Sequence, residues 1–308
     1  MAGRIMVTGG SGFVGSAVIR ELVGRGYGVN ALVNQKDLQI AEGDVRSIKG
    51  GMFDGAAVAE AMIGCDAVMH LVGIIFEKPS AGVTFEKIHF EGTRAIVEGA
   101  RRAGVKRFAQ MSALGARADA VSEYHKTKWR AEEIVRGSGV DWTIMEPSMI
   151  HGPRGEFMVM EAKWARRKAA PFFFMPYFGK GALGLGGSGL IQPVYVNDVA
   201  RAFVDAIGNS KTIGKTYGLG GSEVLTWPQM HRVAAKAIVG KSRLTVAIPA
   251  WYAKALAAIA PAGILPFNRD QVVMSEEDSV CDMTLFEDDF GWKPRGFSLS
   301  LGEYAGEI

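Results

Sequence analysis

Three side chains in the middle of the chain have the types and the spacing needed for proton transfer. Ser112 follows a short apolar run, and Tyr124 and Lys128 come after it as a Y-x-x-x-K pair. On a helix this spacing puts the phenol and the ammonium on one face, where a nearby cation lowers the pKa of the phenol. The serine hydroxyl can polarise a carbonyl group or hold an alcohol. Together the three residues predict a proton relay beside a hydride carrier, with Lys128 also holding the carrier's ribose.

A hydride carrier needs a binding element of its own, and the N-terminal part of the chain contains one. Residues 5–7 are apolar, a glycine-rich turn follows, and Val14, Val18 and Leu22 then recur at helical spacing. Such a turn lets the backbone approach a pyrophosphate at the helix N-terminus. Because a strand precedes the turn and a helix follows it, the pattern predicts dinucleotide binding. The glycines satisfy both G-x-G-x-x-G and G-x-x-G-x-x-G, and the expected contacts are Gly9, Ser11, Gly12, Phe13, Val14 and Gly15.

The end of the second expected strand, residues 29–33, bears on the choice between NAD and NADP. An acid at this place would hold the ribose hydroxyls. This chain has Asn34 and Lys36 there instead, and Asp37 comes three residues late. With no acid to repel a 2′-phosphate and with Lys36 within reach, NADP is favoured. No arginine occupies the position, so the sequence leaves NAD open.

The elements between the glycine turn and the catalytic candidates alternate between strands and helices. This alternation predicts an α/β fold, a doubly wound parallel Rossmann sheet with helices on both faces. Ligands bind such sheets at the carboxyl ends of the strands. Strands are expected at residues 45–48, 67–71, 107–111 and 143–146, and helices at 55–63, 84–103 and 122–136. Besides residues 9–15 and Ser112, the strand ends expected to converge on one crevice carry Asn34, Met52, Leu71, Val72, Gly73, Pro147 and Ser148.

After Pro153 the alternation breaks, and a smaller C-terminal lobe for a substrate or partner is expected. The dinucleotide-binding domain is assigned to residues 1–153, and residues 190–210 return to it with a strand expected at 192–196. The lobe is assigned to 154–189 and 211–308. Residues 171–178 are densely aromatic. They fit an apolar pocket for a small molecule, such as a lipid or a quinone-like ligand, or the core of the lobe, which is the commoner use of phenylalanine.

Further helices are expected in this lobe. One basic stretch covers residues 161–168, and Thr226 can cap another helix. Residues 251–259 form a third, which is too short to span a bilayer. This third helix can lie on a membrane surface or pack on the lobe. The residues expected to end it are Pro261, Gly263 and Pro266.

Composition excludes several classes of protein. The 308 residues are 48% hydrophobic and 22% charged, which is ordinary for a globular protein and excludes disorder, coiled coil and collagen. A net charge of +3 gives no case for nucleic acid as a partner. Cys65 and Cys281 have no metal-type spacing, so no metal is expected. Neither a signal peptide nor a spanning helix is expected, which favours the cytoplasm, with the inner face of the membrane as the alternative.

These motifs resemble the short-chain dehydrogenase/reductase superfamily in its extended or atypical branch. The resemblance rests on residues 8–15, on Ser112 with Tyr124 and Lys128, and on residues 147–153 and 192–200. Residues 70–75 and 89–94 are similar to bacterial relatives of a nucleotide-holding accessory subunit of complex I, alpha subcomplex subunit 9. The resemblance implies a nicotinamide dinucleotide, Ser112, Tyr124 and Lys128 as the catalytic set, and Pro147 and Ser148 near the nicotinamide.

Three positions depart from the family pattern. His89 stands where the family often has an asparagine in the helix before the serine strand, which bears on the proton relay. Gly51 replaces an aspartate after the third strand and leaves the adenine contacts to Met52, and Asn34 holds the clamp position after the second strand. The last two departures bear on the choice of cofactor.

Two functions fit these observations. The first is an NAD(P)-dependent oxidoreductase that moves a hydride between a nicotinamide and a carbonyl or alcohol group, or uses it transiently in an epimerase or dehydratase cycle. The presence of Ser112, Tyr124 and Lys128 favours this enzyme. The alternative is a non-catalytic NADP(H)-holding subunit or assembly factor of respiratory complex I (NADH:ubiquinone oxidoreductase), in contact with that complex or with the membrane. The identity of the substrate and the oligomeric state are left open.

Overall fold

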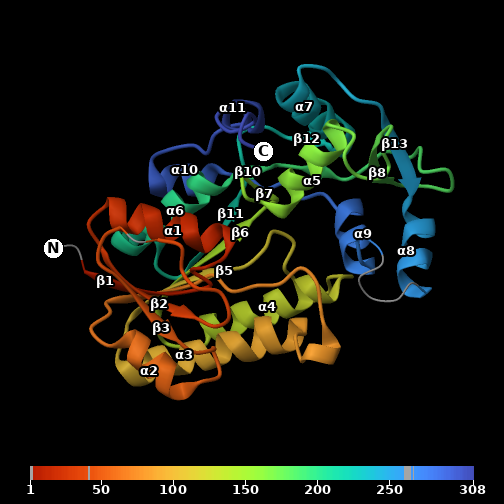
Figure 1. Cartoon of the computed structure of the whole chain (residues 1–308). Coiled ribbons are helices and arrows are strands. Elements are labelled where there is room, and N and C mark those ends of the chain that lie inside the picture. Colours follow the sequence, from red (N-terminus) through yellow and green to blue (C-terminus); the bar gives the residue numbers. More distant parts are fainter. Residues whose placement is uncertain (1–2, 41, 260–264, 266) are drawn as a thin grey trace. The chain divides into compact units, whose positions relative to one another are not determined.

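The computed structural model describes residues 3–40, 42–259, 265 and 267–308, and the chain divides into two units (Figure 1). The first unit consists of Met1–Pro147, Val196–Leu219 and Asp282–Trp292. The second consists of Ser148–Tyr195, Gly220–Cys281 and Lys293–Ile308.

The described residues of the first unit form a seven-stranded parallel sheet in the order β11-β6-β5-β4-β1-β2-β3. The strand order reverses at β1, between β2 and β4, and ligands of doubly wound sheets bind beyond the carboxyl ends of the strands at such a point. The strands are β1 (Arg4–Thr8), β2 (Gly28–Val33), β3 (Val45–Lys49), β4 (Ala67–His70), β5 (Arg107–Met111), β6 (Asp141–Pro147) and β11 (Lys215–Leu219).

Helices cover both faces of this sheet, as the alternating pattern predicts. Helices α1 and α6 pack on each other, whereas α2, α3 and α4 follow one another on the opposite face (Figure 1). Apolar side chains of the central strands, including Met6, Val68, Phe108 and Ile144, are buried against α2 and α3. The helices are α1 (Phe13–Gly24), α2 (Gly55–Met62), α3 (Gly92–Ala103), α4 (Glu123–Arg136), α6 (Val196–Gly208) and α10 (Thr284–Phe290).

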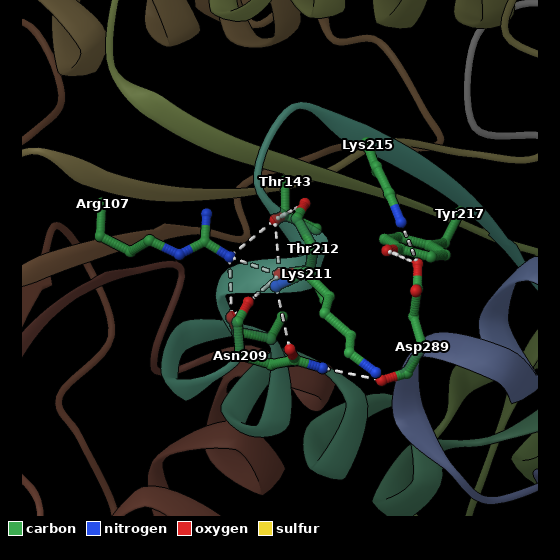
Figure 2. A network of polar contacts seen from close by, with 9 residues as sticks. Arg107, Thr143, Asn209, Lys211, Thr212, Lys215, Tyr217 and Asp289 are labelled. Atoms are coloured by element: carbon green, nitrogen blue, oxygen red, sulfur yellow. Dashed lines mark hydrogen bonds and ion pairs between the residues drawn. The ribbon is translucent and has the colours of Figure 1, made fainter.

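A polar network fixes the returning segments at the amino ends of the strands (Figure 2). Arg107, at the start of β5, donates to Thr143 Oγ1 (2.7 Å) and Thr212 Oγ1 (2.8 Å). Lys215 Nζ and the Tyr217 hydroxyl both donate to Asp289 Oδ2, each at 2.6 Å. These contacts tie the short helix η3 (Ser210–Thr212), β11 and α10 to the sheet, at the end away from the predicted crevice.

One predicted element of the first unit and one of the second differ from the structure. The helix expected over residues 84–103 begins as a π-helical segment, η2 (Glu86–Glu91), and continues as α3. Such segments occur frequently at functional sites. The strand expected around residues 192–196 is only β10 (Val194–Tyr195), because Val196 already begins α6.

The second unit is built from short elements. Its described residues form three two-stranded sheets, in which β7 pairs with β10, β9 with β12, and β8 with β13. The strands are β7 (Ile150–His151), β8 (Met175–Gly179), β9 (Leu190–Ile191), β12 (Leu225–Thr226) and β13 (Thr245–Pro249). The helices are α5 (Glu156–Ala165), α7 (Trp227–Val239), α8 (Ala250–Ile259), α9 (Arg269–Glu276) and α11 (Phe297–Gly302).

The helix predictions for this unit succeed to different degrees. Thr226 caps α7 through a capping box with Gln229, as expected. The helix expected at residues 161–168 is wrong by several residues, because α5 starts after Gly155 and ends before Arg167, whose φ is 58°. The residues expected to end α8, Pro261, Gly263 and Pro266, lie outside the described part of the chain. Within the described part, no helix is long and apolar enough to cross a membrane.

Candidate functional site

The glycine turn between β1 and α1 forms a closely packed backbone cradle. Gly9 has a φ of 74°, and its carbonyl accepts a hydrogen bond from the Gly12 N–H at 3.0 Å. A Cβ atom at Gly15 would lie 2.1 Å from the same carbonyl oxygen, so only glycine fits there. Gly12 is the N-cap residue of α1 and has no side chain to satisfy the first N–H groups. The turn therefore presents free backbone donors at a helix N-terminus, which suits a pyrophosphate.

The end of β4 lies directly against this turn. A Cβ atom at Gly9 would lie 3.2 Å from the backbone of Leu71 and Val72. The Leu71 N–H donates to Thr8 Oγ1 at 3.3 Å, and that oxygen is 2.6 Å from His70 Nδ1. Burial and the nearby Lys128 ammonium lower the pKa of His70 to about 3, so the ring is neutral and shares a hydrogen bond with the threonine hydroxyl. His70 thus helps to fix β1 beside β4 where the strand order reverses.

The Lys128 side chain joins the ends of β4 and β5. Its Nζ donates to the Met111 carbonyl at 3.2 Å, and a Cβ atom at Gly73 would lie 2.9 Å from Nζ. The side chain is buried, which lowers the pKa of the ammonium to about 8. A cation at the carboxyl ends of β4 and β5 is suitably placed to donate a hydrogen bond to a ribose hydroxyl that lies beyond these strands.

Tyr124 lies one helical turn before Lys128, inside a cluster of rings. Its ring centroid is 5.3 Å from that of His89 and 5.7 Å from that of Phe85, both with edge-on geometry. Burial raises the pKa of Tyr124 to about 12. The expectation that the nearby lysine lowers this pKa is therefore wrong for this arrangement, because the loss of hydration dominates. The phenol is present in its protonated form.

His89, which takes the place of an asparagine, has both ring nitrogens in use. The Ile74 N–H donates to Nε2 at 3.1 Å, which leaves the proton on Nδ1 to be donated to Thr127 Oγ1 at 3.0 Å. Burial and Lys128 lower the pKa of His89 to about 2. The neutral imidazole fixes the segment after β4 against α4. It is a positioning group rather than a proton acceptor.

Ser112 belongs to a buried acidic cluster that sequence reasoning did not find. Its hydroxyl donates to Glu132 Oε1, and Glu132 in turn pairs with Arg136 at 2.7 Å. Glu146, on β6, forms a hydrogen bond with the Glu132 carboxyl group. Burial together with the charge of Glu132 raises the pKa of Glu146 to about 8, so Glu146 carries the shared proton at neutral pH. While it donates to Glu132, the Ser112 oxygen is available to accept a hydrogen bond from an alcohol.

This cluster makes a prediction for stability. Below about pH 8 folded Glu146 keeps a proton that the unfolded chain releases above its ordinary value of 4.5. The contribution to the free energy of unfolding is therefore complete below pH 4.5 and is lost progressively as the pH rises to 8, by several kcal/mol in all. We expect Glu146→Gln to remove this decline in urea unfolding at pH 5 and pH 8, whereas the exposed Glu98→Gln keeps it. An equal decline in both variants would refute the assignment.

The remaining residues predicted to bind the cofactor make fewer contacts with the glycine turn and Lys128. Asn34 is exposed beside Gly51, and the Met52 thioether lies against Gly92. Lys36 is exposed, and no contact joins it to the cradle among the described residues. The Pro147 carbonyl accepts from the Leu114 N–H at 3.0 Å, beside the end of β5.

Ser148 begins the second unit. Its hydroxyl donates to the Ser279 carbonyl at 2.9 Å within that unit. The contacts therefore bring together the glycine turn, residues 71–73, Lys128 and the end of β5, but they do not include Lys36 or Ser148. The described residues contain no group of three or more side chains suited to a metal ion.

Comparisons with known proteins agree with this geometry. Residues 9–164, just over half of the chain, match the family described as NAD(P)H-binding. Over 260 residues the chain is 28% identical to NADH dehydrogenase (ubiquinone) 1 alpha subcomplex subunit 9, mitochondrial, of Arabidopsis thaliana, covering 82% of this chain and 62% of that one. It is 30% identical over 153 residues to ceramide reductase of Caulobacter vibrioides, covering 49% and 47% of the two chains.

A solved structure shows the same fold over the whole length. UDP-glucose 4-epimerase from Thermotoga maritima matches with a TM-score of 0.73 and 22% identity, covering 98% of both chains. By contrast, the chain spans only 62% and 47% of the length of the two curated relatives named above. The cradle, the sheet order and these matches agree: the chain belongs to the NAD(P)H-binding family and to the short-chain dehydrogenase/reductase superfamily.

Proposed function

We propose that this protein is an NAD(P)-dependent oxidoreductase acting on a carbonyl or alcohol group of an apolar small molecule. A nicotinamide dinucleotide held by the glycine turn and Lys128 would supply or accept the hydride. Tyr124, protonated at neutral pH, donates a proton to the carbonyl oxygen, and Ser112 accepts a hydrogen bond from the alcohol. An epimerase or dehydratase cycle would use the same residues.

One observation carries the proposal. The buried Lys128 ammonium contacts Gly73 and the Met111 carbonyl, so it stands at the ends of β4 and β5 on the helix that also carries Tyr124. A buried cation is costly unless it is paired or functional, and perturbed groups of this kind gather at active sites. Its position at the edge of the dinucleotide cradle supports a role in holding the nicotinamide ribose.

We propose NADP as the cofactor. Asp37, the acid nearest to the expected position, is engaged by Lys49 at 2.5 Å, which lowers its pKa and partly neutralises its charge toward a 2′-phosphate. Exposed Lys36 then offers a cation to that phosphate.

The cofactor assignment is tested by fluorescence titration with NADPH and NADH. We expect Lys36→Ala to weaken NADPH binding about tenfold and to leave NADH binding unchanged. Lys106→Ala is the matched control, because Lys106 is an exposed lysine before the amino end of β5. An equal loss of affinity for both nucleotides, or no loss for NADPH, would contradict the assignment of Lys36 as the residue that binds the 2′-phosphate.

The reaction is tested with the full chain, NADPH and a panel of cyclic and long-chain aliphatic ketones. Oxidation of NADPH that depends on the ketone, with deuterium transferred from labelled NADPH to the product alcohol, is the expected result. The ceramide reductase similarity supports including long-chain ketones. No turnover on any member, with NADPH bound, would count against the enzyme and for the alternative below.

One observation favours the alternative, a nucleotide-holding subunit or assembly factor of respiratory complex I. The Ser112 hydroxyl donates to Glu132 and the pKa of Tyr124 is raised, an arrangement that a structural subunit tolerates. The similarity to the Arabidopsis subunit supports the same function. A dinucleotide that copurifies with the protein and is never reduced or oxidised is the result expected from it. With either function we place the protein in the cytoplasm.

A further inference from the structure

Acidic residues are missing from two long segments of the second unit. Residues 162–195 contain five lysines and arginines and no aspartate or glutamate, and residues 224–269 contain six, again without an acid. The rest of the chain carries 24 basic and 32 acidic residues. A net charge of only +3 therefore conceals a strongly basic part, which belongs entirely to the second unit.

Most of these cations face solvent. Lys254 pairs with Glu276 at 2.8 Å, and Arg243 Nε donates to the Ala165 carbonyl at 2.7 Å. Others are exposed and form no ion pair with any described residue, namely Lys163, Arg167, Lys168, Arg232, Lys236 and Lys241. Their charge is available to an anionic partner.

The same part of the unit exposes an apolar helix face. The solvent side of α8 consists of Trp251, Tyr252, Ala255, Ala258 and Ile259, at helical spacing and without a charged side chain. The other side is buried, with Ala250 and Ala253 packed in a cluster that includes Val272. The helix is therefore fixed to the unit on one side and apolar toward solvent on the other.

More exposed apolar side chains flank the sheet of β8 and β13, which lie side by side with α8 following β13 (Figure 1). Phe173 is 75% exposed just before β8, and Leu244 is exposed just before β13. Beyond the other end of β8 Leu183 and Leu185 are exposed, and the Trp251 indole N–H donates to the neighbouring Ala182 carbonyl at 2.9 Å. Apolar side chains thus occur at both ends of this sheet and along α8.

We propose that α8 and the β8–β13 sheet dock on the surface of an anionic phospholipid bilayer. Aromatic and aliphatic side chains enter the boundary between headgroups and acyl chains, and the exposed lysines and arginines of the two acid-free segments attract anionic headgroups. Nucleic acid explains the charge, but it does not explain an apolar helix face. A docked oxidoreductase of this kind would be positioned to receive an apolar substrate from the membrane.

The test measures cosedimentation of the full chain with phosphatidylcholine vesicles, with and without about 30 mol% phosphatidylglycerol. We expect at least tenfold tighter binding to the anionic vesicles, weakened by added salt. Phe172→Ser with Phe173→Ser, or Trp251→Ser, should weaken binding at least tenfold. Replacing Arg167, Lys168 and Lys241 by glutamine should remove the salt dependence.

Matched controls come from the first unit, where Ile63→Ser alters an exposed apolar residue and Lys106→Gln an exposed cation. Both should bind anionic vesicles like the unchanged protein, and NADPH titration checks that every variant is folded. Equal binding to both vesicle types, or none, would overturn the proposal. Binding to duplex RNA that is weakened only by the charge variants would also overturn it, in favour of nucleic acid. A dimer that is lost in the apolar variants would overturn it in favour of a second copy of the chain. A failed ketone screen leaves this result unaffected, since vesicle binding needs no turnover.

Discussion

Gly15→Ala is expected to abolish dinucleotide binding, raising the Kd for NADPH at least a hundredfold. The added Cβ would lie 2.1 Å from the Gly9 carbonyl oxygen and 2.8 Å from the Gly10 Cα atom. Both are backbone atoms, so no side chain can move aside, and the turn must open or α1 must shift. Either change misdirects the helix N-terminus at the pyrophosphate. Nicotinamide fluorescence measures the effect.

The same helix supplies the control. Gly24 ends α1 with open space around its Cα, so Gly24→Ala should bind NADPH normally and leave stability unchanged or slightly higher. Should Gly15→Ala fail to fold, Gly12→Ala still tests the cradle, because its Cβ would lie 3.1 Å from the Gly9 oxygen and demands only a small shift. Normal NADPH affinity in Gly12→Ala and Gly15→Ala would refute the assignment of this turn.

The central strands of the sheet were predictable because they are buried on both faces. Strands such as β1 and β4 read as continuous apolar runs, which short windows of sequence reveal. Strand β11 was not predicted. It has the sequence KTYGL, with only Tyr217 and Leu219 buried, and lies at the sheet edge. Its place depends on Asp289, from a segment seventy residues further along, which local patterns cannot show.

The candidate site was predictable in its parts but not in its electrostatics. Motif spacing identified Ser112, Tyr124 and Lys128. It could not show that Glu132 and Glu146 converge on Ser112, because that depends on β6 lying beside β5. Glu132 lies four residues after Lys128 on the same helix face, and this spacing was the one feature of the sequence that could have indicated the acidic cluster. Nor could the sequence show that rings from η2 surround Tyr124 and raise its pKa.

The proposed docking surface, α8 and the β8–β13 sheet, shows a different limitation. Part of the evidence for it, the uneven distribution of charge, was present in the sequence. Net charge over the whole chain averages a basic second unit against an acidic remainder. Counting charges by segment reveals the two regions without acids. That count alone is consistent with nucleic acid as well as lipid. The exposure of Phe173 and of the α8 face favours lipid, and exposure depends on tertiary packing.

Tyr124→Phe is expected to lower the turnover number by about a thousandfold, within the usual range for loss of a general acid. The substitution removes only the hydroxyl, and the ring can keep its packing against Phe85 and His89. NADPH binding should therefore stay within about threefold of the unchanged protein, since a conservative loss without a lost contact costs little binding. The rate is measured with whichever ketone of the panel supports turnover.

The pH profile separates a proton-donating role from a structural one. Because burial raises the pKa of Tyr124 to about 12, the phenol stays protonated across the accessible range and ketone reduction should not fall through its ionisation below about pH 10. Two buried groups, Glu146 and Lys128, have a pKa of about 8, so a decline near pH 8 that disappears in Glu146→Gln comes from Glu146, and one that persists comes from Lys128. Tyr27→Phe, a partly buried tyrosine remote in sequence from the motif, should change neither rate nor profile. A Tyr124→Phe variant that keeps its rate would remove the phenol from the reaction and leave the proton donor to another group of the site.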